Sequence, residues 1–148
     1  MVLSAICYRA PLRGSLLDGL SGADIDRLLD RFRHLNRLNG VTGAILLHGD
    51  QVVVWLEGET SGLTDSRSSI VDDLRLGGTG PLCSGPLAAR LFPHCWLCLA
   101  DSRVEVPAGV AELLEQPAPV SLDQARKAML CVAERLDGCR YTRAAMLV

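Results

Sequence analysis

The residues able to carry out chemistry in this sequence are few, and one short motif among them has a recognisable spacing. His94 is followed by Cys95-Trp96-Leu97-Cys98, a Cys-x-x-Cys pair of the kind that binds a metal or cycles between dithiol and disulfide. A structural zinc site usually needs four ligands, and the sequence has no second close cysteine pair. Residues three apart in an extended strand also face opposite sides. Packing of one or both cysteines in a core is therefore the competing interpretation.

The other candidates for catalysis have no supporting context. Gly77-Gly78-Thr79-Gly80 is rich in glycine, but it lacks the Gly-Lys-Ser/Thr ending of a phosphate-binding loop and reads as a turn. His34 and His48 are isolated, and no histidine has a neighbouring serine or cysteine in a recognisable triad context. We therefore expect that the chain is not an enzyme.

The size and charge of the chain restrict its partners. The sequence has 148 residues, which is enough for one domain with a tail and a substantial core. A formal net charge of −2 gives no basic footprint for nucleic acid. No apolar segment approaches the ~18 residues that span a membrane, and the N-terminus does not read as a secretion signal. We expect a cytoplasmic protein that binds neither nucleic acid nor a membrane.

Cysteine is unusually frequent in this sequence. Six cysteines lie mostly inside apolar runs: Cys7, Cys83, Cys95, Cys98, Cys131 and Cys139. Free cysteine packs as a small hydrophobic residue. Without a secretion signal, we expect reduced cysteines in a core rather than a disulfide framework.

Periodicity and turn residues predict five strands and four helices. Strands are predicted at Val2–Tyr8, Val41–His48, Gln51–Glu57, Leu82–Ala88 and Trp96–Ala100. Helices are predicted from Ser21 to Gly40, Thr60 to Leu76, Val110 to Glu115 and Leu122 to Leu136. The residues 9–19 contain Pro11, Gly14 and Gly19 and are expected to form a loop.

Two of these helices have a clear apolar stripe. In the first, the stripe consists of Ile25, Leu28, Leu29, Phe32, Leu35 and Leu38. In the last, the apolar residues that share a face are Ala125, Met129, Val132 and Leu136. Gly49-Asp50, between the second and third strands, is the signal of a tight hairpin.

The order strand, helix, strand, strand, helix, strand predicts an α+β fold of the ferredoxin-like (βαββαβ) type, here with one extra strand. The two helices of this core would cover one face of the sheet. We therefore expect the C-terminal helices to cover the other face. We predict a core domain at residues 1–101 and a C-terminal helical extension at residues 102–148 that packs on the sheet.

Several segments in a fixed order carry a resemblance to a known family. They are Cys7-Tyr8-Arg9, Asn36 six residues before Thr42-Gly43-Ala44, Trp55-Leu56-Glu57-Gly58, the set Ile70, Asp73 and Arg75, and Arg90-Leu91-Phe92-Pro93 ahead of Trp96. In this order they resemble the BLUF domain, a flavin-binding sensor of blue light, over roughly Met1 to Ala100. The resemblance implies FAD as the cofactor, with its ring between the two helices of the core.

The resemblance also implies roles for single residues. It makes Tyr8 the electron-donating tyrosine, against the alternative of an aromatic residue at a strand end. It makes Asn36 the asparagine that hydrogen-bonds the flavin ring, against the alternative of a satisfied packing residue. It places Asp73 and Arg75 near the ribityl or phosphate part of a flavin nucleotide, and an exposed charge pair is the competing interpretation.

The chain departs from the family at the residue that drives the light response. Val54 stands where the family has a glutamine, whose amide is both a donor and an acceptor and can exchange the two. Trp96 corresponds to the tryptophan of the fifth strand, and Cys98 stands where the family has a methionine. The resemblance therefore implies a cofactor site at Tyr8, Asn36 and Val54 whose usual photocycle is impaired.

These observations lead to one main expectation and two alternatives. The main expectation is a BLUF-like regulatory protein that acts through an unidentified protein partner or as a homo-oligomer, with binding of FAD or its loss left open. The first alternative is a working flavin photoreceptor with a rewired hydrogen-bond network. The second is a thiol-redox or metal-binding module that uses Cys95 and Cys98.

Overall fold

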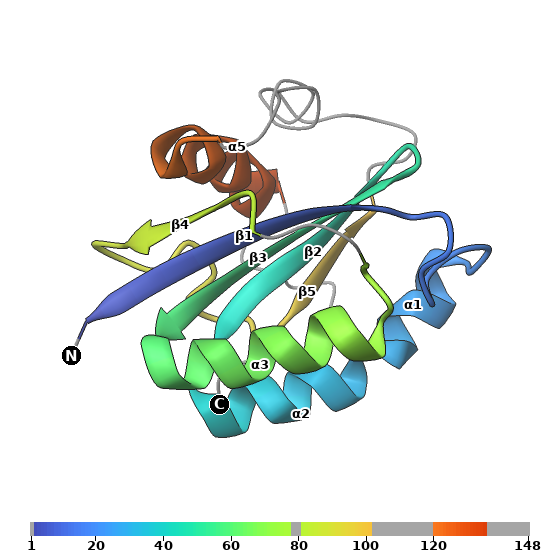
Figure 1. Ribbon diagram of the computed structural model, residues 1–148, viewed down its shortest axis with the longest axis horizontal. Helices are drawn as coiled ribbons and strands as arrows, with labels where there is room; N and C mark the ends of the chain where they lie inside the picture. The colour runs from blue at the N-terminus through green and yellow to red at the C-terminus, as the bar shows by residue number, and fades with distance from the viewer. Residues whose placement is uncertain (1, 78–80, 102–119, 136–148) are drawn as a thin grey trace.

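The computed structural model describes residues 2–77, 81–101 and 120–135 of the chain, and a five-stranded sheet is its centre (Figure 1). The strands are β1 (Leu3–Pro11), β2 (Thr42–His48), β3 (Gln51–Glu59), β4 (Cys83–Pro86) and β5 (Cys98–Asp101). The helices are α1 (Gly22–Leu28), α2 (Asp30–Asn39), α3 (Thr60–Asp73) and α5 (Leu122–Arg135). All five predicted strands are therefore present.

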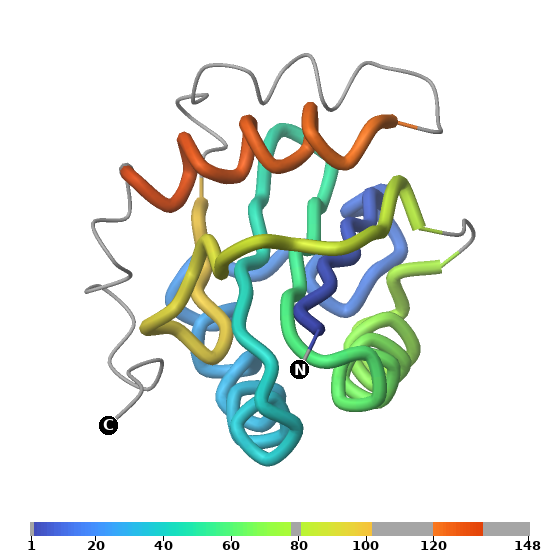
Figure 2. Tube along the Cα trace, turned by 90° about the vertical axis from the view of Figure 1, so that its left-hand side faces the viewer, coloured from blue at the N-terminus to red at the C-terminus, as the bar shows by residue number. Residues whose placement is uncertain are grey.

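The strand order β4-β1-β3-β2-β5 confirms the ferredoxin-like α+β prediction with an extra strand. Strand β1 pairs antiparallel with both β3 and β4, and β2 pairs antiparallel with β3. The extra strand β5 lies parallel to β2 at the far edge. Helices α1, α2 and α3 cover one face of the sheet, and α5 lies across the other face (Figures 1 and 2).

Alternation along the strands divides the interior into two hydrophobic clusters. In β3, Val53 and Trp55 face α5, whereas Val52, Val54 and Leu56 face α2 and α3. All five side chains are at most 1 % exposed. A strand buried on both faces reads as a continuous apolar run, which is how this strand appears in the sequence. The face of the sheet on which a β3 side chain lies is therefore determined by its position in the alternation along the strand, and not by its polarity.

The predicted first helix is interrupted at Leu29, where α1 ends and α2 begins. The buried guanidinium of Arg33 donates to the carbonyl of Asp26, with Nη1 and O 2.8 Å apart. This carbonyl would otherwise accept from the amide four residues later, so the side chain satisfies it where the helix is interrupted. Helix α1 begins at the predicted place, and the side chain of Ser21 caps it by accepting from the amide of Asp24.

Two details of the sequence prediction are wrong. Leu38, assigned to the apolar stripe, is 71 % exposed, because it lies two residues, or about 200°, past Asn36 on a helix whose buried face contains Phe32 and Asn36. The first strand also continues to Pro11, into the predicted loop, because pairing with β3 extends to the Pro11–Gln51 pair.

The C-terminal part is described over α5 only. Ala125, Met129 and Val132 are buried in the cluster between α5 and the sheet, as their shared face predicts. The predicted helix Val110–Glu115 and the residue Leu136 lie outside the described residues. The division of the chain at residues 101 and 102 stays a prediction.

Candidate functional site

Strand pairing brings Tyr8 and Val54 side by side on the face covered by α2 and α3. Tyr8 lies directly opposite Val54 in the β1–β3 pair, and Val54 lies opposite Ile45 in the β2–β3 pair. All three belong to the cluster under the helices, and Val54 is 1 % exposed. The side chain next to the tyrosine is thus an isopropyl group with no hydrogen-bonding atom.

The hydroxyl of Tyr8 has its partner on α3 instead. Arg67 Nη1 donates to the Tyr8 hydroxyl oxygen, with the two atoms 2.5 Å apart, and the guanidinium carbon lies 5.6 Å from the ring centroid. Burial raises the pKa of Tyr8, while the charge and the hydrogen bond of Arg67 oppose that rise. Arg67 was missed in the sequence, although it lies four residues after Leu63 and three before Ile70, on the inward side of α3.

Asn36 contributes an amide to the same interior from α2. It is fully buried, and its Nδ2 donates to the carbonyl oxygen of Trp96 at 2.6 Å. Among the residues that the structure describes, no group donates to Asn36 Oδ1. A buried acceptor without a donor costs about 1–3 kcal/mol, so this oxygen is suited to a ligand that carries an N–H group.

Arg33, one turn earlier on α2, fastens the same backbone segment. Its Nε donates to the carbonyl of Leu97 at 2.7 Å, and its guanidinium is paired with Asp26 and Asp30 at 2.5 and 2.8 Å. The side chain is 3 % exposed, and pairing with two carboxylates offsets the cost of burying its charge. Helix α2 therefore holds the residues 96–97 through two buried polar side chains, of which sequence reasoning found only Asn36.

The structure separates Cys98 from the other predicted cofactor residues. Cys98 lies opposite Ala44 in the β2–β5 pair and packs in the cluster beneath α5, so it is on the other face of the sheet from Tyr8. Leu97 faces α2 and α3 instead, and Trp96 is half-buried. The face on which Cys98 lies is set by the pairing of β5 with β2, and a shift of one residue would exchange the two faces of the strand.

Asp73 and Arg75 lie at the exposed C-terminal end of α3. Asp73 Oδ2 is 3.8 Å from Arg31 Nη2, and both side chains are more than half exposed. Arg75 is exposed and has a φ of 55°, as is common just past a helix end. Both charges are therefore solvated, Asp73 has Arg31 as its neighbour, and a role of Asp73 and Arg75 at a flavin nucleotide stays a prediction.

The Cys-x-x-Cys pair is buried under α5. Cys95 and Cys98 are both 0 % exposed and belong to the same cluster, so the expectation that they face opposite sides is wrong. Cys95 precedes the regular strand, where simple alternation does not apply. Within the described part of the chain, no three His, Cys, Asp or Glu side chains are grouped as a metal site would require.

A second buried polar centre lies beneath the other face, at the carboxylate of Glu57. Its Oε1 accepts from Trp55 Nε1 and the amide of Leu91, each at 2.8 Å. Its Oε2 accepts from the hydroxyl of Thr42 and the amide of Phe92, each at 2.9 Å. Four donors satisfy this buried carboxylate, which fixes the loop that leads to β5.

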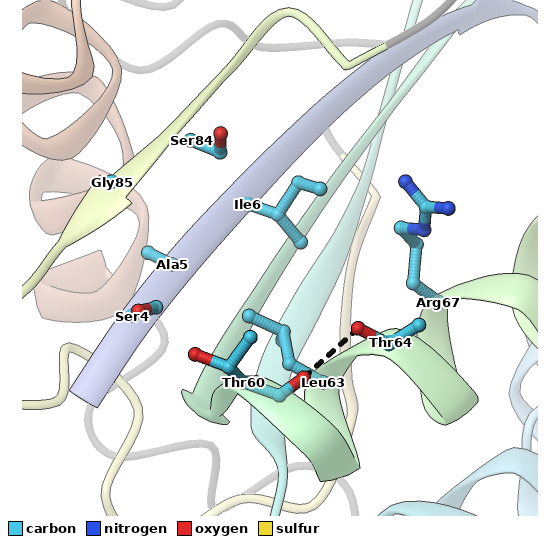
Figure 3. A pocket seen from close by; sticks show the side chains of 9 residues that line it. All are labelled: Ser4, Ala5, Ile6, Thr60, Leu63, Thr64, Arg67, Ser84 and Gly85. Carbon is cyan, nitrogen blue, oxygen red and sulfur yellow. Dashed lines mark hydrogen bonds between the residues drawn. The ribbon is translucent and has the colours of Figure 1, made fainter. Parts of the chain in front are cut away.

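A pocket of about 290 Å³ lies on the far side of α3 from α2 (Figure 3). Its lining residues come from β1, β4 and α3: Ser4, Ala5, Ile6, Ser84, Gly85, Thr60, Leu63, Thr64 and Arg67. Arg67 connects this pocket with Tyr8, whereas Asn36 is not among the lining residues. The pocket is therefore separate from the space between α2 and α3.

Comparison with known proteins agrees with this geometry. Residues 3–97 match the profile of the family described as BLUF, sensors of blue-light using FAD. The solved dark-state structure of BlrB, a BLUF protein, has a TM-score of 0.71 at 23 % identity, over 91 % of this chain and 98 % of that one. The BlrP1 BLUF structure has a TM-score of 0.62 at 26 % identity, over 95 % of each chain.

A bacterial light-regulated adenylyl cyclase also matches, with a TM-score of 0.61 at 19 % identity. The match covers 90 % of this chain but 36 % of the cyclase, so only part of that protein is similar. A comparison with curated protein sequences finds no relative. None of the helices in the described ranges is long and apolar enough to cross a membrane.

Proposed function

The chain belongs to the BLUF family of sensors that use FAD, and from this premise we propose that it binds a flavin but lacks the family's usual response to blue light. The observation that carries the proposal is the pairing of Tyr8 with Val54 in the β1–β3 register. A bound flavin would supply the absorption of blue light. The residues of this chain determine whether that absorption changes the hydrogen bonding around it.

The buried amide of Asn36 supports flavin binding. A flavin ring carries an N–H donor and carbonyl acceptors, and Asn36 Oδ1 is a buried acceptor without a donor in the described structure. Tyr8 on β1 belongs to the cluster beneath α2 and α3, and Asn36 is fully buried on α2, one of the two helices between which the family resemblance places the ring. The residues that would hold the ring are therefore Asn36 and Tyr8, with Val54 as an apolar wall.

The residues around Tyr8 support the loss of the usual response. That response needs a side chain that can exchange a donor for an acceptor, as an amide can. Val54 has neither group, and the guanidinium of Arg67 only donates. Tyr8 therefore keeps a fixed donor from Arg67, and neither Val54 nor Arg67 can perform the exchange that follows illumination in the family.

Absorption spectroscopy tests both parts of this proposal. The purified protein is mixed with FAD or FMN, excess flavin is removed, and spectra are recorded in the dark and after blue illumination. We expect a flavin band that stays with the protein and does not shift to the red. Loss of the band on gel filtration would refute flavin binding, and a reversible red shift would refute the argument about Val54.

The bond between Arg67 and Tyr8 is the one observation that favours a second candidate, a photoreceptor with a rewired network. In that case Arg67 replaces the amide as the partner of Tyr8. A red shift in the wild type that disappears in Arg67→Met would support it. The third candidate, a metal or thiol module at Cys95 and Cys98, would require bound metal or a reversible disulfide between these two residues.

The proposal extends to the output of the protein. BLUF domains are sensors rather than catalysts, and we propose that this chain acts by contacting a partner protein or copies of itself. The similar solved structures include a light-regulated adenylyl cyclase, in which the similar part is 36 % of the cyclase chain. Light scattering of the purified protein at several concentrations distinguishes self-association from a monomer that requires a separate partner.

A further inference from the structure

Cys7 and Cys83 form a cross-strand pair at the edge of the sheet. They are direct partners in the antiparallel β1–β4 register. Direct antiparallel partners have Cα atoms about 4.5–5.5 Å apart, which lies within the range of about 4.4–6.8 Å found in disulfides. Both side chains also lie on the same face of the sheet, since Cys7 belongs to the cluster beneath α5 and Cys83 packs against that cluster. No large backbone movement is therefore needed to join them.

The backbone holds the two residues in this position. The amide of Leu82 donates to the carbonyl of Cys7 at 2.7 Å, directly beside the pair. The amide of Val120 in turn donates to the carbonyl of Leu82 at 3.2 Å, so the segment that leads into α5 is attached at the same place. Strand β4 has only four residues and lies at the edge next to β1 (Figure 1).

The two thiols have different environments. Cys7 is completely buried, and the hydrogen bond to Cys83 together with burial raises its pKa. Cys83 is half-buried, and the hydrogen bond from Cys7 lowers the pKa of its thiol. The thiolate is the reactive form of cysteine, so Cys83 is the group suited to attack an oxidant from solvent. Cys7 is held within reach of the oxidised sulfur.

We propose that Cys7 and Cys83 are a hydroperoxide-sensitive thiol pair that closes to a disulfide across β1 and β4. The Cys83 thiolate attacks one oxygen of the hydroperoxide, the O–O bond breaks, an alcohol or water leaves, and Cys83 becomes a sulfenic acid. The Cys7 sulfur then attacks the Cys83 sulfur, the S–S bond forms, the S–O bond breaks and water leaves. Two thiols lose two electrons and two protons, and the hydroperoxide is reduced.

This site is independent of the flavin proposal, although it lies close to the same strand. Cys7 points to the α5 face and precedes Tyr8, which points to the α2 and α3 face. A disulfide would connect the edge strand covalently to β1, and the attachment of Val120 next to Cys83 would connect it to the start of α5. A disulfide between Cys7 and Cys83 would therefore form where the segment that leads into α5 is attached to the sheet.

Peptide mapping of the full-length protein after treatment with hydrogen peroxide tests the proposal. Trypsin separates Cys7 and Cys83 into the peptides 1–9 and 76–90, and Cys131 into the peptide 128–135. We expect two of the six thiols to become resistant to alkylation, with one disulfide that joins the first two peptides. A disulfide that joins other peptides, or six thiols that remain alkylatable, would overturn the proposal.

Three single variants sharpen the test. In Cys7→Ser, Cys83 should accumulate as a sulfenic acid that dimedone captures, because no second thiol resolves it. In Cys83→Ser, Cys7 should remain a thiol, because it is buried. The matched control is Cys131→Ser, which removes another half-buried cysteine and should form the Cys7–Cys83 disulfide as the wild type does. Oxidation of Cys7 in Cys83→Ser would show that the assigned order of attack is wrong.

Discussion

Replacement of Asn36 by alanine should cost the flavin-free protein almost no stability, which would be unusual for a fully buried polar residue. The substitution removes the bond to the Trp96 carbonyl, worth about 0.5–1.5 kcal/mol net, and leaves a small cavity that costs about 1 kcal/mol. It also removes the buried Oδ1 that has no donor among the described residues, which relieves about 1–3 kcal/mol. Helix propensity adds about 0.5 kcal/mol in favour of alanine.

At the midpoints of these ranges the contributions sum to within about 1 kcal/mol of zero. A neighbouring residue provides the contrast. Asn39 Nδ2 donates to the hydroxyl oxygen of Ser66 at 3.0 Å, and Ser66 is fully buried. Asn39→Ala leaves the Ser66 hydroxyl without this donor, and it removes no buried polar atom that lacked a hydrogen-bond partner. The same chemical change on the same helix should therefore lower the free energy of unfolding by about 1–2 kcal/mol.

Urea unfolding without flavin measures this contrast, and unfolding with added FAD completes it. A ligand present at 100 times its dissociation constant stabilises the folded state by about 2.7 kcal/mol. We expect this gain in the wild type and in Asn39→Ala, and its loss in Asn36→Ala. If Asn36→Ala destabilises the flavin-free protein as much as Asn39→Ala does, Asn36 is a packing residue, and the assignment of its amide to a ligand is refuted.

Two further substitutions test other parts of the structure. Arg67→Met should raise the pKa of Tyr8 further, because the cation and its hydrogen bond oppose the effect of burial. An absorbance titration of the phenol measures this pKa, and Tyr8→Phe identifies which signal belongs to Tyr8. A lower pKa in Arg67→Met would contradict the contact between Arg67 and Tyr8. Glu57→Gln should lower the free energy of unfolding by about 2–4 kcal/mol, because an amide nitrogen cannot accept from two of the four donors. The control Glu59→Gln changes an exposed residue and should stay within about 0.5 kcal/mol of the wild type; equal effects of the two substitutions would rule out the network around Glu57.

Local signals in the sequence were sufficient for the elements and for most of their arrangement. The two residues Gly49-Asp50 predict the β2–β3 hairpin, because a two-residue turn determines the register of both strands. That register places Val54 opposite Ile45, whereas the pairing of Val54 with Tyr8 depends on the separate register between β1 and β3. The face formed by Ala125, Met129 and Val132 likewise predicts that α5 covers the open side of the sheet.

The contacts that sequence reasoning missed are those between residues far apart in the chain. Arg67 lies in a polar stretch of a weakly amphipathic helix, and no local pattern indicates that its partner is Tyr8, 59 positions earlier. Cys98 lies on the opposite face of the sheet from Tyr8, and the sequence does not indicate this because the alternation along β5 begins only at Cys98 itself. Cys7 and Cys83 lie opposite each other because of how β4, an edge strand of four residues, pairs with β1. Periodicity in the sequence does not determine this pairing.

The light-induced difference spectrum of Val54→Gln bound to FAD tests the central claim most directly. Val54→Leu is the control, since it changes the volume at the same position without adding an amide. We predict that wild type and Val54→Leu retain flavin without a red shift, and that Val54→Gln gains a reversible red shift of the flavin band. A red shift in the wild type, or none in a flavin-loaded Val54→Gln, would contradict the claim that this position decides the light response.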